Sequence, residues 1–172
     1  MKIMTQGIYI LLGSNLGDRE KSLAKALGRI EGIEGLELVA ASSVYISEAQ
    51  DMQGENPSFL NQVIKADYDY SPGELLSALE NIEIELGRTD KGKKSPRTID
   101  LDILLFDDRT METERLTIPH SELLNRPFAM VPLLQIDPDL IHPGTGKQVS
   151  EYLNDESQTE VILYKDYVAR TV

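Results

Sequence analysis

The sequence predicts an α+β fold in which an antiparallel sheet carries its helices on one face. Short β-rich runs alternate with segments whose apolar residues recur at helical spacing, and the order is β-α-β-β-α-β. That order is the ferredoxin-like arrangement. With 172 residues, of which 41% are hydrophobic, the chain is expected to form a single domain over residues 1–172.

The first half of the pattern contains three strands and one helix. We expect the strands at Ile8–Leu12, Leu36–Ile46 and Phe59–Tyr70, with a polar loop at 48–57 before the third. Asp18 is the expected N-cap of the helix, and Gly32 its end. Within the helix, Leu23, Leu27 and Ile30 follow at i, i+4 and i+7.

The second half begins with a strong helix signal. Ser71 is the expected N-cap, Pro72 the first helical residue and Glu74 the partner in a capping box, and the helix should stop at Gly87. A strand at Thr98–Phe106 and a turn at 107–109 follow. We then expect a short helix from Ser121 and a Pro-bounded helix at Phe128–Gln135. The stretch 147–172 is a C-terminal extension, with one helical pattern and one strand-like run, to which the sequence assigns no role.

Charge and composition exclude several classes of protein. The formal net charge of −12 argues against a nucleic-acid partner, because binders of the phosphate backbone are normally basic. No window approaches the ~18 consecutive apolar residues of a membrane span. The chain has no cysteine and no signal-like N-terminus, so the cytoplasm is the expected location, and we expect a monomer.

One segment, 87–106, combines a basic loop with a carboxylate pair. Five of the 17 Lys and Arg residues fall within 88–97, which suggests a small anionic ligand on an otherwise acidic protein. Asp100 and Asp102 share one face of the following strand, and two adjacent carboxylates in an apolar strand suggest ligands for Mg²⁺. The residues alone leave open a solvent-facing strand edge, or an Asp100–Arg97 pair.

The same segment also imitates a P-loop. Residues 87–93 fit the first seven positions of that pattern, but residue 94 is Lys where Ser or Thr is required. A P-loop also joins a strand to a helix, whereas this loop joins a helix to a strand. We therefore reject a P-loop.

The run SPRTIDLDILLF resembles the signature of the 6-hydroxymethyl-7,8-dihydropterin pyrophosphokinase family. LLGSNLGDRE, FLNQV, RLTIPH and NRPF also occur in the family's order, and together they span roughly residues 7 to 143. The resemblance implies transfer of the diphosphate of ATP to the hydroxymethyl group of the pterin, with release of AMP, in folate biosynthesis. It also implies a ferredoxin-like fold, which agrees with the order of elements above.

The resemblance assigns a role to each matched position. It implies that Asp100 and Asp102 hold two Mg²⁺ ions, and that the loop residues Arg88 and Arg97 are catalytic and clamp the phosphates. Along the triphosphate and nucleoside it places His120, Arg126, Arg115, Thr117 and Ile103. Around the pterin it places Asn61 at the ring edge, Phe59 and Phe128 on the two ring faces, and Ser47 in the wall. Glu83 occupies the position of an acidic residue near the metal site.

Simpler explanations exist for some of these residues. Phe59 and Phe128, taken alone, are typical core residues, and His120 alone is typical of a capping histidine. The chain also departs from the family at Asp90, Lys94 and Ser47-Glu48. Asp90 is the main hint of a second class of protein, a non-catalytic Mg-nucleotide sensor. A third class, an RNA or protein interaction module, is disfavoured by the acidic charge.

Overall fold

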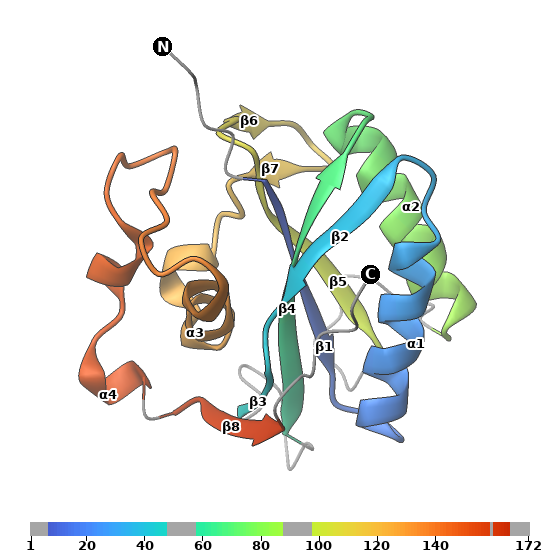
Figure 1. Cartoon of the computed structure of the whole chain (residues 1–172), viewed down its shortest axis with the longest axis horizontal. Helices are drawn as coiled ribbons and strands as arrows, with labels where there is room; N and C mark the ends of the chain where they lie inside the picture. Colours follow the sequence, from blue (N-terminus) through green and yellow to red (C-terminus); the bar gives the residue numbers. More distant parts are fainter. Residues whose placement is uncertain (1–6, 48–57, 88–97, 159, 166–172) are drawn as a thin grey trace.

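A six-stranded sheet forms the centre of the protein, with helices on both of its faces (Figure 1). The computed structural model describes residues 7–47, 58–87, 98–158 and 160–165. The expected loops at 48–57 and 88–97, the second with Arg88 and Arg97, lie outside the described residues. In the described parts of the chain, no helix is both long and apolar enough to span a membrane.

The strands pair in the order β5-β1-β4-β3-β8, with β2 pairing to β4 beside β3, and every pairing is antiparallel. Their bounds are β1 Ile8–Ser14, β2 Leu36–Ala41, β3 Val44–Ser47, β4 Phe59–Tyr68, β5 Asp100–Phe106 and β8 Ile162–Lys165. A separate two-stranded sheet joins β6 (Met111–Glu112) to β7 (Thr117–Ile118).

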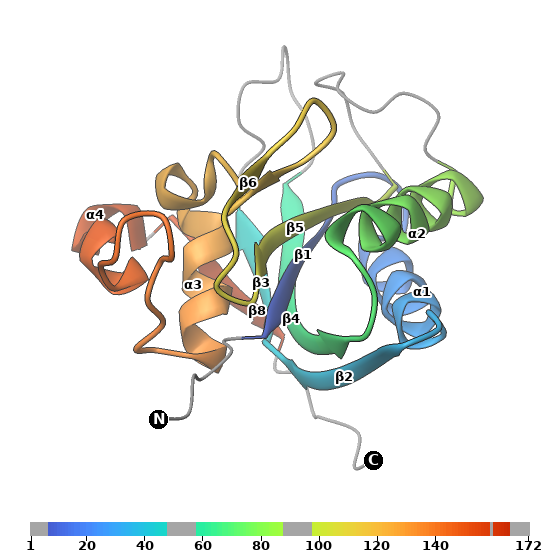
Figure 2. The same cartoon turned by 90° about the horizontal axis from the view of Figure 1, so that it is seen from above.

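The helices divide the core into two layers. Helices α1 (Arg19–Glu31) and α2 (Pro72–Glu85) cover one face of the sheet, and α3 (Pro127–Ile136) covers the other (Figures 1 and 2). The sequence predicted helices on one face of the sheet, which holds for α1 and α2 but not for α3. The layer under α1 and α2 contains Ile10, Leu12 and Leu101, and the layer under α3 contains Leu11 and Val63. A 3₁₀ turn, η1 (Leu123–Asn125), precedes α3, and a second 3₁₀ turn, η2 (Val149–Tyr152), and α4 (Asp155–Gln158) follow it.

Local signals placed both long helices correctly. The Asp18 side chain accepts a hydrogen bond from the N–H of Lys21, as an N-cap does. Ser71 and Glu74 form the expected capping box, with Pro72 in the first turn of α2. The turn expected at 107–109 is also present, with Asp107 in the left-handed region at φ 53°.

The strand expected at Leu36–Ile46 is wrong in one respect: the chain forms two strands, β2 and β3, separated at Ser42-Ser43. Ser42 bonds Val63 twice, through its own N–H at 2.8 Å and through its hydroxyl, which accepts the N–H of Val63 at 3.0 Å. The side chain of Ser42 thus replaces a backbone group of the ladder, and the strand is interrupted. The elements β6 and α4 were not expected from the sequence.

Candidate functional site

A row of residues crosses the sheet on the face that α3 covers. Gly13 on β1 is paired with Asp100 on β5 and with Asn61 on β4, and Asn61 is paired with Tyr45 on β3. Leu11 and Val63, two positions from Gly13 and Asn61, pack under α3, so the alternation of strand side chains places this row on the same face. The carboxylate pair and Asn61 therefore belong to one surface.

Asn61 lies at the buried end of this row. Its side chain is 2% exposed, and its amide nitrogen donates a hydrogen bond of 2.7 Å to the hydroxyl of Ser47. A Cβ at Gly13 would lie 3.4 Å from Asn61 Oδ1 and 3.5 Å from Cδ1 of Phe59. The structure thus brings together Ser47, Asn61 and Phe59. Gly13, which has no side chain, leaves the space next to Asn61 and Phe59 open.

Asp100 and Asp102 share one face of β5, as predicted. Leu101 and Ile103 point into the layer under α1 and α2, so the two half-buried carboxylates face the opposite way. A hydrogen bond from α2 fixes the backbone between the two aspartates: the buried carboxylate of Glu83 accepts the N–H of Leu101 at 2.8 Å. Glu83 therefore supports the strand that carries the pair.

The donor set at Asp100 and Asp102 fits a Mg²⁺ ion that arrives with a phosphate chain. Mg²⁺ is usually held by one or two carboxylates together with phosphate oxygens and waters. Among the residues that the structure describes, no group of three or more His, Cys, Asp or Glu side chains could hold a metal by itself. Asp100 and Asp102 supply the two carboxylates, and phosphate oxygens and waters would supply the remaining ligands, so no third protein ligand is needed.

A cavity of about 200 Å³ lies beside the carboxylates. It is lined by Asp102, predicted to hold Mg²⁺, and by four of the residues predicted along the nucleotide: Ile103, Arg115, Thr117 and His120. The β6–β7 hairpin provides one wall, since Thr113 to Thr117 lie between and within these two strands. Residues far apart in the sequence thus form one small polar recess.

Two of these residues are oriented by neighbours. The guanidinium of Arg115 forms an ion pair of 2.6 Å with Glu80 on α2, and this pair holds the exposed Arg115 side chain against the helix. His120 accepts the N–H of Glu122 on Nδ1 at 3.1 Å, and this bond is the capping role considered above. A neutral His120 then carries its proton on Nε2, the nitrogen suited to donate to a phosphate oxygen.

Arg126 and Phe128 stand at the start of α3. Arg126 is the N-cap residue, and its guanidinium lies 5.7 Å from the centre of the Phe128 ring. Phe128 is half-buried and also packs against the core layer under α3, so the core explanation of this residue holds in part. Neither residue lines the small cavity.

Gly13 is not among the site residues predicted from the sequence. Its pairing with both Asp100 and Asn61 follows from strand order, which the sequence does not reveal. A glycine at the end of a strand is a signal of close approach by a ligand or another backbone, and this signal was available.

Comparisons with known proteins agree on one family. The model of the 7,8-dihydro-6-hydroxymethylpterin-pyrophosphokinase (HPPK) family matches residues 9–138. A 2-amino-4-hydroxy-6-hydroxymethyldihydropteridine pyrophosphokinase of Aquifex aeolicus is 41% identical over 145 residues, which is 84% of this chain and 89% of that protein. The protein of the same name from Pseudomonas aeruginosa is 39% identical over 150 residues, 87% of this chain and 91% of its own length.

Other relatives are much longer. The folic acid synthesis protein fol1 of Schizosaccharomyces pombe is 40% identical over 159 residues, and the chain spans 22% of that protein. Among solved structures, wild-type Plasmodium falciparum HPPK-DHPS with pteroate has a TM-score of 0.65 at 13% identity, covering 88% of this chain and 43% of its own. Another HPPK-DHPS structure, in complex with substrates, has a TM-score of 0.62 at 12% identity, covering 84% and 42%. These structures support the fold.

Proposed function

Because this chain belongs to the 7,8-dihydro-6-hydroxymethylpterin-pyrophosphokinase family, we propose that it transfers the diphosphate of ATP to the hydroxymethyl group of 6-hydroxymethyl-7,8-dihydropterin and releases AMP. One observation carries the proposal: Asp100, Gly13 and Asn61 form a single row, which sets the carboxylate pair on the same face of the sheet as Asn61. Phosphoryl-transfer chemistry needs this proximity, since acceptor and phosphates must meet in line.

We propose that Ser47, Phe59 and Asn61 form part of a pocket for the pterin. Asn61 Oδ1 faces Gly13, while its amide nitrogen is bonded to Ser47, so the amide presents an acceptor toward the floor of the pocket. Phe59 borders this floor and supplies one aromatic face, and Phe128 at the start of α3 supplies the second. Stacking on aromatic rings suits a flat heterocycle, and the amide fixes its orientation.

We assign the cavity of the β6–β7 hairpin to the nucleotide, with Ile103, Arg115 and Thr117 on its nucleoside side and His120 toward the phosphates. Arg126, at the N-cap of α3, would extend the cationic lining along the triphosphate. Arg88 and Arg97, outside the described residues, keep their proposed role as phosphate clamps. Positioning and charge neutralisation are the main demands of this reaction, because no covalent protein intermediate is needed.

Asp100 and Asp102 would hold Mg²⁺, and we propose two ions. When bound, Mg²⁺ neutralises the triphosphate and orients its oxygens. The chain's own contribution is a fixed pair of carboxylates on β5, held in place by the bond from Leu101 to Glu83.

The proposal also covers the fold type, the oligomeric state, the location and the domain organisation. The ferredoxin-like classification is supported by the strand order, in which β1 lies between β4 and β5, and β2 and β3 both pair with β4. We also propose a monomer in the cytoplasm that acts on small molecules. A single domain over 1–172 is supported by the sheet, since β8 from the C-terminal extension pairs with β3.

A product assay tests the activity. The protein is incubated with ATP, Mg²⁺ and the hydroxymethyldihydropterin, and the nucleotides are separated. AMP in amounts equal to the pterin diphosphate is expected, whereas ADP, or no product, would refute the proposal and leave a nucleotide sensor as the better explanation.

The carboxylates are tested by binding. In Asp102→Asn, Mg²⁺-dependent ATP affinity should fall at least tenfold, because a neutral amide removes one anionic ligand of the metal. Asp108→Asn, an exposed aspartate in the turn after β5, is the matched control. Unchanged affinity in Asp102→Asn would remove the metal role.

A further inference from the structure

We propose that Gln135 and Tyr45 are positioning residues for the pterin pocket: they fasten α3 to β3 and so set the width of the slot between Phe128 and the sheet. The inference rests on the proposed function, and it adds two residues to which neither the sequence signature nor the family comparison gives a role.

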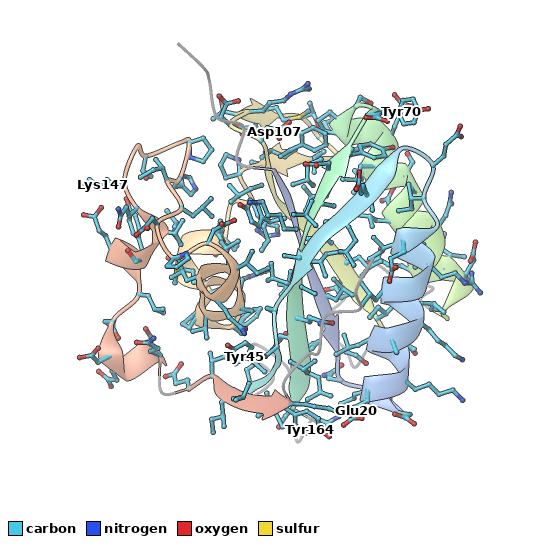
Figure 3. All side chains as sticks on the ribbon, viewed as in Figure 1. Glu20, Tyr45, Tyr70, Asp107, Lys147 and Tyr164 are labelled. Atoms are coloured by element: carbon cyan, nitrogen blue, oxygen red, sulfur yellow. The ribbon has the colours of Figure 1, made fainter. Side chains whose placement is uncertain are left out.

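The contacts are a cluster of hydrogen bonds between the end of α3 and the sheet. Gln135 Oε1 accepts from the Tyr45 hydroxyl at 2.8 Å and from the N–H of Ser43 at 2.9 Å. Its Nε2 donates to the Ser43 hydroxyl at 2.9 Å. Figure 3 shows Tyr45 on the side of the sheet that α3 occupies. A single side chain on α3 thus bonds Ser43, just before β3, and Tyr45 within β3.

The position of Gln135 on α3 connects this cluster to the pocket. Phe128 precedes Gln135 by seven residues, so the two side chains lie on nearly the same side of the helix, about 10 Å apart along its axis. On β3, Tyr45 and Ser47 are two residues apart and share a face, at a spacing of about 7 Å. Fixing Gln135 over Tyr45 therefore limits where Phe128 can lie relative to the strand end that carries Ser47.

The strand side of the cluster also reaches the pterin pocket directly. Tyr45 is the cross-strand partner of Asn61, and Ser47 accepts the hydrogen bond of the Asn61 amide. A shift of β3 would therefore move both the neighbour of Asn61 and its hydrogen-bond acceptor. The interruption at Ser42-Ser43 makes β3 a short strand of four residues, which needs such an external anchor.

Apart from Arg126 at the N-cap of α3, the residues assigned to the nucleotide belong to other elements. The cavity beside Asp102 is lined from α2, β5 and the β6–β7 hairpin, and none of its lining residues belongs to α3 or β3. Loss of the clamp should therefore weaken pterin binding more than nucleotide binding. A residue needed only for general stability would not separate the two substrates in this way.

The test compares three variants with a conservative one. Gln135→Leu removes all three hydrogen bonds at similar size, and Tyr45→Phe removes one. Gln135→Glu keeps two acceptor bonds, and its second oxygen can accept from the Ser43 hydroxyl, which then donates instead of accepting. Gln158→Leu on α4 makes the same chemical change on an exposed glutamine away from the sheet.

KM for each substrate is measured in the AMP assay, and pterin affinity is measured separately in the presence of a non-hydrolysable ATP analogue. In Gln135→Leu the KM and Kd for the pterin should rise about five- to tenfold, the size expected when a small hydrogen-bond cluster is lost. KM for ATP should stay within about twofold. Tyr45→Phe should lie between this variant and the wild type, and Gln135→Glu and Gln158→Leu should resemble the wild type.

Three results would overturn the inference. The first is a wild-type pterin KM in Gln135→Leu; the second is an equal rise for both substrates together with a lower midpoint of thermal unfolding; the third is no rescue in Gln135→Glu. If the wild-type protein neither binds nor converts the pterin, the proposed function fails and the inference fails with it. An active wild type with an unaffected Gln135→Leu refutes the inference alone.

Discussion

Asp137, at the C-terminal end of α3, should contribute about 2–3 kcal/mol to the free energy of unfolding, because it accepts a hydrogen bond from a buried tyrosine hydroxyl. The Tyr9 hydroxyl donates to Asp137, and Tyr9 is fully buried. Burial first, and then Asp137, raise the pKa of Tyr9 above its ordinary value, so the hydroxyl keeps its proton and remains a donor. Lys65 adds an ion pair to Asp137 at 2.9 Å.

The magnitude follows from two contributions. In Asp137→Ala the buried Tyr9 hydroxyl loses the hydrogen bond to Asp137, which costs roughly 1–3 kcal/mol. The ion pair adds less than about 1 kcal/mol, since both side chains remain partly exposed to solvent and are screened. For a chain of this size, a loss of about 2–3 kcal/mol lowers the midpoint of thermal unfolding by roughly 5–10 °C.

Urea unfolding, followed by circular dichroism, measures the effect. Asp139→Ala, an exposed aspartate two residues further on, is the control and should change stability by less than about 0.5 kcal/mol. Tyr9→Phe removes the hydroxyl, so the cost of Asp137→Ala should shrink by at least half in that background. An equal cost of Asp137→Ala in both backgrounds would show that the buried hydroxyl is not the reason.

Two further predictions concern a turn and the floor of the pterin pocket. The Nδ1 of buried His142 accepts the N–H groups of Gly144 and Thr145, and burial lowers the pKa of His142 below 6.5. The folded state thus favours the neutral ring, so the stability that His142 contributes is complete above pH 6.5 and is lost as the pH falls through the lowered pKa of the folded state. When unfolding is measured between pH 8 and pH 5, His142→Asn should therefore lose less stability than the wild type. Equal losses in the two proteins would contradict this explanation. Gly13→Val would place side-chain atoms against Asn61 and Phe59, so pterin affinity should fall at least tenfold while ATP affinity stays unchanged. A pterin Kd equal to that of the wild type would show that Gly13 does not border the pterin pocket.

Local sequence signals predicted the parts of the fold that depend on neighbours in the chain. The capping box of Ser71 and Glu74 joins residues three apart, and the shared face of Asp100 and Asp102 follows from the two-residue period of a strand. Both were predicted and both are present. The family resemblance, confirmed by the match over residues 9–138, supplied candidate site residues that spacing alone could not identify, and their roles stay predictions.

Features that depend on distant partners were not predictable in this way. The break at Ser42-Ser43 needs Val63 and Gln135, and the support of β5 needs Glu83 to reach Leu101 from another element. Hydrophobic periodicity contains no information about such hydrogen bonds. The roles of Arg88 and Arg97 lie outside the described residues and remain predictions.

The pairing of β8 with β3 has a consequence for the order in which the protein folds. Tyr45 pairs with Leu163, so this edge of the sheet joins residues separated by most of the chain. Closing so long a loop costs entropy before its contacts form, and pairings of this kind form slowly. β3, which carries Ser47 and Tyr45, gains its outer neighbour only when the C-terminal extension arrives. We therefore expect that extension, which the sequence left without a role, to determine how quickly the wall of the pterin pocket becomes rigid after synthesis.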